Sequence, residues 1–259
     1  MERSDAVPLG NRAALARIVA LCDEASATPA GIALEAARDE GFAALLMRLA
    51  NSAESASVTR VSELTTAVVR LGLRHVQGLA LAAPGLRLLT GPNDGLGPAR
   101  VALHRHAVRT GLAARLLAPV GVEPEHALAA GLLHNIGLNM LSLCEPQLFA
   151  AMLADISAEQ VTAGFTHAEL GARLAERWSY PRPLAEAIRE HDSDVPMTQL
   201  GAVVHVADRL VRRAGIGVEP AVDPTAPALE LAQVADITEA EARLEPLLAA
   251  QDRFDAFQG

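Results

Sequence analysis

Apolar residues recur at intervals of three and four along most of this chain, which is the spacing of one face of an α-helix. Residues 11–22 and residues 40–53 show the pattern most clearly, with these apolar positions: Leu15, Ile18, Val19 and Cys22, then Phe42, Leu45, Leu46 and Leu49. No segment shows the sustained alternation of apolar and polar residues that is typical of a strand. The pattern therefore predicts an all-α, multi-helix fold.

Capping residues, glycines and prolines predict where the first helices begin and end. Thr28 followed by Pro29 is typical of an N-cap and a first helical residue. Ser62 is expected to cap a helix that Gly72 ends, and Pro84 is expected to end the next one. The helices expected in this part cover residues 11–22, 29–38, 40–53, 62–71 and 73–83.

A segment rich in glycine and proline, residues 90–98, separates these helices from the rest and is expected to be a hinge. Beyond it we expect helices over residues 99–117, 123–143, 145–156, 167–178, 181–191, 196–213 and 238–251, with residues 218–227 irregular. Thr166 and Glu169 form a capping box, and Thr238 is expected to cap the last helix. These breaks predict an N-terminal helical sub-domain (1–95), a second helical sub-domain (96–213) and a C-terminal extension (214–259).

Composition narrows the classes of function. The chain has no lysine, which excludes lysine-based Schiff-base chemistry, and its net charge of −9 argues against a nucleic-acid-binding protein. Cys22 and Cys144 are far apart, which favours a reduced, cytoplasmic protein without a disulfide framework. The N-terminus does not resemble a signal peptide, and no apolar stretch of about 18 residues is free of charge or proline. We therefore expect neither a membrane span nor a nucleic-acid partner.

Histidines are concentrated beyond the expected hinge, where seven of the eight occur. His106, His134 and Asp208 belong to three different expected helices, so a helical bundle could bring them to one site. Imidazole and carboxylate together suit zinc, manganese or iron. His104 and His106 differ by about 200° around a helix axis, so only one of them can face such a site. Alternatively, any one of these histidines is a solvated or hydrogen-bonded helix residue with no role in metal binding.

Several motifs, in order, resemble the HDOD family, a divergent relative of the HD-type metal phosphohydrolases. The segments that carry the resemblance are Arg48–Ala53, Ala67–Leu73, Gly131–Gly137, Thr166–Ala172, Trp178 with Pro181, and Val204–Asp208. The resemblance covers roughly residues 10–213 and implies an N-terminal helical portion followed by an HD-like helical bundle. It also implies a signalling module, since HDOD members are generally regarded as such, often without demonstrated catalysis.

The resemblance also implies a set of metal ligands. His106, His134 and Asp208 align with the ligands of the hydrolase relatives, and His167 and His191 resemble extra ligands of the HD-GYP phosphodiesterases. The chain departs from these enzymes at three positions. Asn135 replaces an aspartate, Leu138 replaces a lysine, and Asp192 replaces a histidine.

The change at Asn135 has a physical consequence. An asparagine offers a metal one neutral carbonyl oxygen, whereas an aspartate can bridge two ions as an anion. The lost charge is worth on the order of 4 kcal/mol at about 4 Å and an effective dielectric near 20. We expect at most a mononuclear site, in which His106, His134 and Asp208 bind with or without His167 and His191.

Five further residues are interpreted as a structural signature of the fold rather than as chemistry: Asn51, Ser52, Gly72, Gly137 and Trp178. Asn51 and Ser52 are expected to cap or turn and to pack between the two portions. Trp178, the only tryptophan, is expected to anchor the helical core.

The sequence favours a non-catalytic regulatory module that acts through a signalling protein partner or a small bound signal, and no catalytic residue is assigned. The alternative is a metal-dependent phosphohydrolase with a degenerate ligand set. A third reading, a structural scaffold, predicts that apolar side chains fill the site. The sequence specifies neither the partner nor the oligomeric state.

Overall fold

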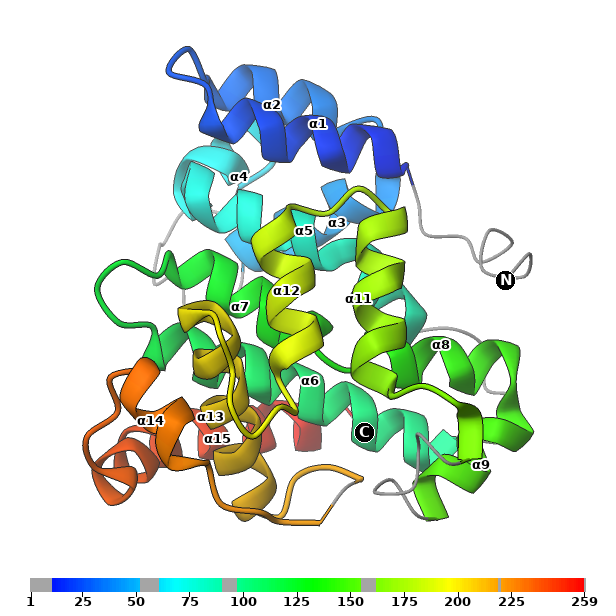
Figure 1. The fold of residues 1–259 in the computed structure, drawn as a ribbon. Coiled ribbons are helices and arrows are strands. Elements are labelled where there is room, and N and C mark those ends of the chain that lie inside the picture. The colour runs from blue at the N-terminus through cyan, green and yellow to red at the C-terminus, as the bar shows by residue number, and fades with distance from the viewer. Residues whose placement is uncertain (1–10, 52–60, 90–96, 155–161, 219, 259) are drawn as a thin grey trace. The chain divides into compact units, whose positions relative to one another are not determined.

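The computed structural model describes residues 11–51, 61–89, 97–154, 162–218 and 220–258 (Figure 1). The described part of the chain is helical and contains no strand, which confirms the predicted fold class. The chain divides into two compact units, one of Pro8–Arg87 and one that includes Leu88–Gly259. Each unit is described by itself.

Five helices in the described part of the first unit surround a core of its own. These helices are α1 (Arg12–Asp23), α2 (Pro29–Ala36), α3 (Glu40–Ala50), α4 (Leu64–Leu71) and α5 (Leu73–Leu89). Their shared core includes Leu15, Ile18, Ile32, Phe42, Leu46, Val68 and Val76. The apolar positions that recur at helical spacing therefore face this core, and their burial is the main source of stability for short helices of this kind.

Two boundaries in this unit are as predicted and two are not. The Thr28 hydroxyl accepts a hydrogen bond from the Gly31 amide at 3.2 Å, and Gly72 ends α4 with a positive φ of 82°. The N-cap of α4 is Glu63 rather than Ser62, and its side chain makes no capping hydrogen bond to the described first turn of the helix. Pro84 lies inside α5 and does not end it. The buried apolar face of α5 around Ala80 and Ala83 stabilises the helix despite the hydrogen bond that proline removes.

Asn51 joins the end of α3 to a residue ten positions later. Its Nδ2 donates to the carbonyl oxygens of Met47 (2.9 Å) and Val61 (3.0 Å), and its Oδ1 accepts from the Val61 amide (2.8 Å). The side chain therefore closes the segment between α3 and α4 with three hydrogen bonds. Ser52, its predicted companion, lies outside the described residues.

Replacing Asn51 with alanine is expected to lower the free energy of unfolding by about 2 kcal/mol, because three hydrogen bonds to backbone groups are lost. Asn51→Asp keeps the oxygen that accepts from the Val61 amide but turns a carboxylate oxygen toward the Met47 and Val61 carbonyl oxygens, so we expect it to be no more stable than the alanine variant. Urea unfolding followed by circular dichroism measures both variants. An alanine variant within about 0.5 kcal/mol of the wild type would contradict this role.

The second unit contains the remaining helices. They are α6 (Gly97–Leu117), α7 (Pro124–Leu133), α8 (Ile136–Cys144), α9 (Pro146–Ala154), α11 (His167–Arg177), α12 (Arg182–Glu190), α13 (Gln199–Arg213), α14 (Ala226–Leu231) and α15 (Ile237–Gln258). Helix α6 packs against both α7 and α13, and α11 packs against α8 and α12 (Figure 1). The capping box is confirmed, because the Thr166 hydroxyl accepts from the Glu169 amide at 3.1 Å.

The prediction of one helix over residues 123–143 is wrong, because the chain turns at His134 and Asn135 and forms α7 and α8 instead. The residues on both sides of this turn are buried, so the apolar pattern continues without interruption across it. Periodicity alone could not reveal a break between two buried helices. The turn gives His134 and Asn135 positions at the facing ends of two helices.

By length and composition alone, Pro124–Cys144 could cross a membrane, with a mean hydropathy of 1.4. In the fold 89% of that window is buried, as in the core helices of a folded domain. Its apolar character is therefore explained by packing within the second unit.

The C-terminal residues share the core of the second unit. Ala228, Ala232, Ala240, Leu244 and Leu248 pack in one hydrophobic cluster with residues of α6, α7 and α13. The segment expected to be irregular contains the start of α14 at Ala226. Asp236, rather than Thr238, caps α15, because its Oδ1 accepts from the Thr238 amide at 2.7 Å.

Candidate metal centre

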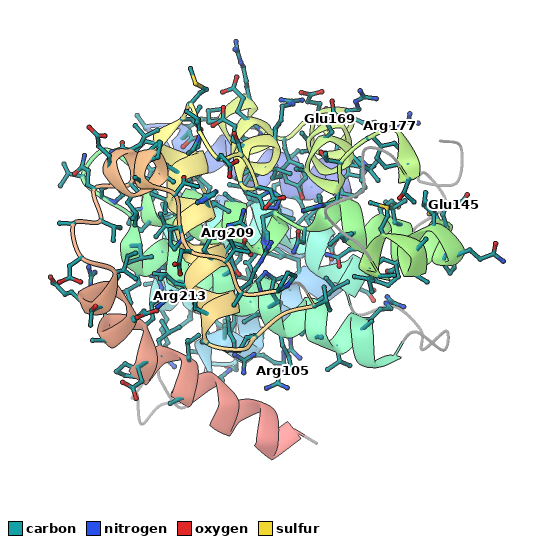
Figure 2. The ribbon with its side chains drawn as sticks, turned by 60° about the horizontal axis from the view of Figure 1, so that its bottom comes forward. Arg105, Glu145, Glu169, Arg177, Arg209 and Arg213 are labelled. Atoms are coloured by element: carbon teal, nitrogen blue, oxygen red, sulfur yellow. The ribbon has the colours of Figure 1, made fainter. Side chains whose placement is uncertain are left out.

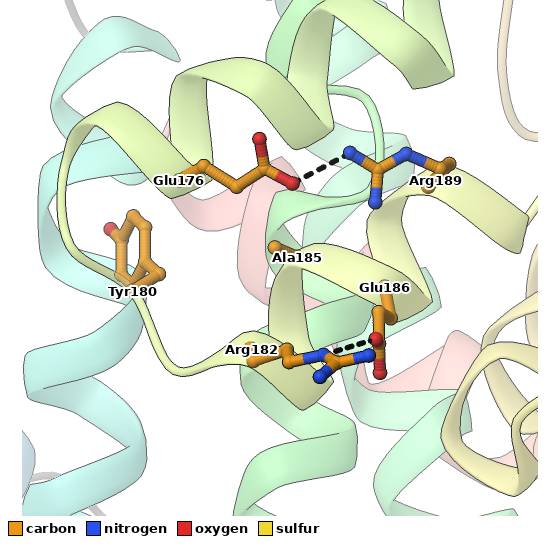
Figure 3. Close-up of a pocket in the computed structure, with 6 residues that line it drawn as sticks. All are labelled: Glu176, Tyr180, Arg182, Ala185, Glu186 and Arg189. Carbon is orange, nitrogen blue, oxygen red and sulfur yellow. Dashed lines mark hydrogen bonds and ion pairs between the residues drawn. The ribbon is translucent and has the colours of Figure 1, made fainter.

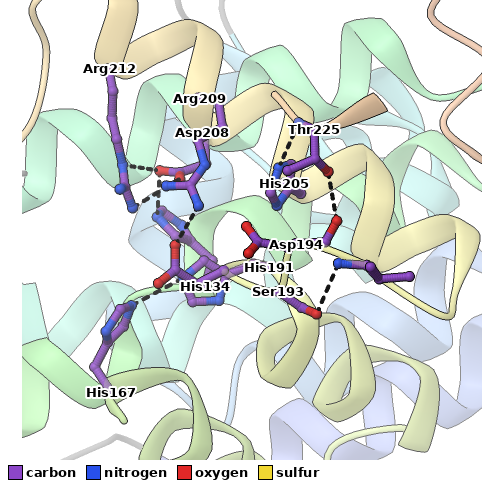
Figure 4. Close-up of polar contacts among 12 residues, drawn as sticks. His134, His167, His191, Ser193, Asp194, His205, Asp208, Arg209, Arg212 and Thr225 are labelled. Atoms are coloured by element: carbon purple, nitrogen blue, oxygen red, sulfur yellow. Dashed lines mark hydrogen bonds and ion pairs between the residues drawn. The ribbon is translucent and has the colours of Figure 1, made fainter. Parts of the chain in front are cut away.

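Three segments of the second unit bring two imidazoles and a carboxylate together. His106 lies on α6, His134 follows α7, and Asp208 lies on α13. His106 Nε2 is 3.1 Å from His134 Nε2 and 2.8 Å from Asp208 Oδ1, and His134 Nε2 is 3.5 Å from the same oxygen. The three side chains are 0–1% exposed. Figure 4 shows His134 and Asp208 lying close together, with Arg212 and Arg209 beside Asp208.

Two glycines allow α6 and α7 to approach closely enough to form this group. A Cβ added at Gly131 would lie 2.7 Å from the Gly111 Cα and 2.8 Å from the Thr110 carbonyl oxygen. No side chain can occupy that space, so glycine at position 131 is required for the contact. The crossing places His134, three residues after Gly131, beside His106 of α6.

Backbone carbonyls determine which ring nitrogens carry protons. His106 Nδ1 donates to the Ile216 carbonyl (2.9 Å), and His134 Nδ1 donates to the Gly131 carbonyl (2.7 Å). A neutral imidazole with a protonated Nδ1 has a lone pair on Nε2. Two such lone pairs and a carboxylate oxygen therefore face one another, and one cation at their centre would satisfy all three. That cation is either a proton on one imidazole or a metal ion.

The triangle has the dimensions of a metal site. Ligands that bind tetrahedral zinc at about 2.0–2.1 Å lie roughly 3.3 Å from one another. The three edges observed here, 2.8, 3.1 and 3.5 Å, bracket that value. The donor set His106, His134 and Asp208 therefore fits one divalent ion and leaves room for no second ion among its own atoms.

His167 and His191 extend the group into a row of four histidines. Ring centroids are 5.0 Å apart from His106 to His134, 5.0 Å from His134 to His191 and 5.1 Å from His191 to His167. His191 Nδ1 donates to the Ile188 carbonyl, and its Nε2 lies 3.1 Å from His167 Nε2. The structure thus brings together all five of the predicted histidine and aspartate positions.

Gly137 allows α8 and α11 to pack closely enough for His167 to join the row of four histidines. A Cβ at this position would lie 2.1 Å from the His167 carbonyl oxygen and 3.0 Å from the Gly171 amide nitrogen. The start of α8 therefore lies directly against the start of α11. This contact places His167, the first residue of α11, near the turn that carries His134.

Asn135 is 1% exposed, and neither atom of its amide group has a hydrogen-bond partner within the described residues. A buried amide without partners is costly, so this side chain has the capacity for a further bond. Its oxygen is neutral and cannot provide the bridging charge that an aspartate gives to two ions. Leu138, which replaces a lysine of the enzymes, is fully buried in the core.

Burial and charge shift the pKa values of the group in one consistent pattern. Burial lowers the pKa of His134 and lowers the pKa of His191 well below its usual range, where the neighbouring His134 and His167 act in the same direction. Burial alone would raise the pKa of Asp208. The positive charge of Arg212 outweighs burial and, together with the neighbouring histidines, holds that pKa well below its usual range. These shifts favour neutral His134 and His191 beside an ionised Asp208, which are the forms that bind metal.

A family model of the HDOD domain, compared with the chain, matches residues 12–194. The chain belongs to the HDOD family. A curated relative from Treponema pallidum, an uncharacterized protein, is 34% identical over 160 residues, and this chain spans about 30% of its length.

Solved structures share the HDOD fold. An HDOD domain protein of unknown function from Geobacter sulfurreducens has a TM-score of 0.67 at 21% identity, with 95% of this chain and 88% of that chain covered. A Marinobacter aquaeolei protein, assigned by inference to signal transduction, has a TM-score of 0.71 at 22% identity over 94% of this chain and 57% of that chain. A Shewanella amazonensis protein, inferred to be a phosphohydrolase, has a TM-score of 0.69 at 21% identity over 95% and 93%.

Two arginines complete the HDOD centre and were not predicted from the sequence. Arg212 donates from Nε to Asp208 Oδ1 (2.9 Å), and Arg209 donates to Asp192 Oδ1 (2.7 Å) (Figure 4). The available signal was the spacing of four residues between Asp208 and Arg212 on one helix, which places the two side chains side by side. Asp192, the position at which the related enzymes have a histidine, is therefore paired with Arg209.

The remaining candidates lie outside the triangle. His205 is buried and accepts a hydrogen bond from the Thr225 amide at 3.3 Å, and burial followed by the Arg209 charge lowers its pKa. His104 is partly exposed. Trp178, which is 8% exposed, ends α11 within the core of the HDOD bundle.

An open pocket of about 460 Å³ lies elsewhere on the second unit (Figure 3). It is lined by Glu176, Tyr180, Arg182, Ala185, Glu186 and Arg189. Its arginines pair with its glutamates, Arg189 with Glu176 at 2.7 Å and Arg182 with Glu186 at 2.6 Å. None of the metal-centre residues lines this pocket.

Proposed function

We propose that this chain is a non-catalytic HDOD signal-transduction module that acts through protein partners. One observation carries the proposal. All six residues of the candidate centre are 0–1% exposed: His106, His134, Asn135, His167, His191 and Asp208. A phosphoester must reach a metal-bound water to be hydrolysed, and side chains buried to this degree offer it no approach.

The charges of the centre support the same proposal. Two-metal hydrolysis needs anionic ligands that hold two ions close together. Here Asp208 is the only carboxylate in the triangle, and Asn135 is neutral. The centre can therefore hold one ion but lacks the ligands for a paired-ion reaction centre.

A single divalent ion would have a structural role in this module. His106, His134 and Asp208 would hold it, and the ion would supply the positive charge that their facing acceptor atoms require. Because these residues come from three separate segments, binding would stabilise the packing of α6, α7 and α13 against one another. Zinc, manganese and iron all suit this donor set.

The signalling role rests on the family and on the fold. The Marinobacter aquaeolei protein that shares this fold is assigned by inference to signal transduction. Because the polar centre is buried, a partner can be recognised only by residues on the surface of the module. We therefore propose that the partner is a protein. The chain has no lysine and a net charge of −9, which fits a protein partner better than a nucleic acid.

Purified protein, supplied in turn with Mn²⁺, Zn²⁺ and Fe²⁺, is expected not to hydrolyse bis(p-nitrophenyl) phosphate faster than its His134→Ala variant. The reason is that the centre is enclosed and lacks a second ion. Release of p-nitrophenol measures turnover, and elemental analysis of the same samples shows whether metal was bound. Turnover that requires metal and is abolished by His134→Ala would refute the proposal.

A metal-dependent phosphohydrolase is the second candidate, and the triangle of His106, His134 and Asp208 favours it. A Shewanella amazonensis protein with this fold is inferred to be a phosphohydrolase. This function would require the centre to open when substrate binds. The same assay separates the two candidates, because only the second expects turnover that depends on His134.

A further inference from the structure

Both oxygens of Asp208 are engaged by one guanidinium group. Arg212 Nε donates to Oδ1 at 2.9 Å, and Arg212 Nη2 forms an ion pair with Oδ2 at 2.9 Å. Oδ1 is also the oxygen that faces His106 and His134. Arg209 adds a more distant ion pair with Oδ2 at 3.8 Å. The only carboxylate of the triangle is therefore shared between the metal position and arginine.

Arg212 is held in this position. Its side chain is 2% exposed, and it lies one helical turn after Asp208 on α13. A buried guanidinium next to a carboxylate neutralises it without any metal. The centre is thus already balanced in charge, and a divalent ion would enter beside a fixed positive charge.

We propose that Arg212 limits the metal affinity of this centre by competing for Asp208. Its guanidinium leaves one lone pair of Oδ1 for a single ion and closes Oδ2 to a second. Arg212 is a positioning residue, because it acts through Asp208 and need not contact the ion. The inference rests on the proposed single-ion centre and names the side chain that regulates its occupancy.

Three variants separate this role from general effects of charge. Arg212→Gln removes the positive charge, whereas Arg212→Lys retains it at the same position. Arg213→Gln is the matched control, since it removes the same charge from the next residue of α13. Arg213 forms ion pairs with Asp223 and with Glu241 of α15 rather than with Asp208. Figure 2 labels Arg213 together with Arg209, which lies on the same helix.

The experiment measures Zn²⁺ affinity of the metal-free full chain by competition with a zinc indicator, together with the rise in Tm that Zn²⁺ produces. We expect Arg212→Gln to bind Zn²⁺ about 10-fold tighter than the wild type or more, because a positive charge near the ion is removed. Its Zn²⁺-induced rise in Tm should be larger for the same reason. Arg212→Lys and Arg213→Gln should stay within about threefold of the wild type.

The proposal is overturned if Arg212→Gln binds no more than about threefold tighter than both of its control variants. If Arg212→Gln does not fold without metal, we expect Zn²⁺ to restore folding, because the ion then neutralises Asp208. Failure to fold in both conditions, judged by circular dichroism, would also contradict the proposal. The affinity measurement uses no substrate, so turnover by the wild type would refute the proposed function and leave this comparison intact.

Discussion

Replacing Gly137 with alanine is expected to lower the free energy of unfolding by about 3 kcal/mol. The added Cβ would lie 2.1 Å from the His167 carbonyl oxygen, and that oxygen belongs to the backbone at the start of α11. A backbone atom cannot rotate away, so α8 and α11 must separate. Urea unfolding followed by circular dichroism measures the loss.

Gly171→Ala is the control for this prediction. It lies at the same contact between helices, but its nearest neighbour is the Cγ2 methyl of Ile188 at 3.0 Å. A side chain can adjust, so we expect a loss of only about 1 kcal/mol. Equal losses in the two variants would mean that the approach of α8 to the His167 backbone is not the critical contact.

Acidification is expected to destabilise the metal-free protein progressively as the pH falls below about 6.5. Burial lowers the pKa of His134 and His191 below the ordinary value of 6.5 in the folded state. Below that pH the unfolded chain binds protons that the folded chain does not, so stability is present above pH 6.5 and is lost as the pH falls. Each histidine contributes up to about 1.4 kcal/mol per pH unit. Urea unfolding at several pH values after chelation measures the slope.

His191→Gln tests the assignment of this slope. Glutamine does not titrate, so the variant should lose stability less steeply over the same range. Asp208 does not add to the loss of stability above about pH 3.8, the ordinary pKa of its carboxyl group. Its pKa is held below the usual 3.8, so its contribution is lost only at lower pH. A variant with the slope of the wild type would show that His191 is not among the groups responsible.

The sequence predicted much of this fold because many of its helix ends carry local signals. Thr28 and Thr166 cap helices as expected, and Gly72 ends one, because capping depends on neighbouring residues alone. The turn at His134 and Asn135 was missed because burial on both sides gives the two helices one continuous apolar pattern. The prediction that Pro84 ends a helix is wrong because the packing of α5 outweighs the helix-breaking tendency of proline.

The candidate site was anticipated only in part. Motif order indicated which histidines and which aspartate belong together, and the structure places them in one cluster. What the sequence could not show is distance. The spacing of four residues places Arg212 beside Asp208 but does not indicate that it engages both carboxylate oxygens. It also does not indicate that the buried Asn135 amide has no hydrogen-bond partner among the described residues.

The shared core of α6, α13 and α15 has a practical consequence for anyone who transplants this module into a fusion protein. The family match ends at residue 194, yet Asp208 and the core residues up to Leu248 follow it. A graft cut at the end of the family match would carry two histidines of the triangle without their carboxylate, on a bundle with an exposed apolar face. The smallest portable piece of the second unit therefore extends at least to Leu248.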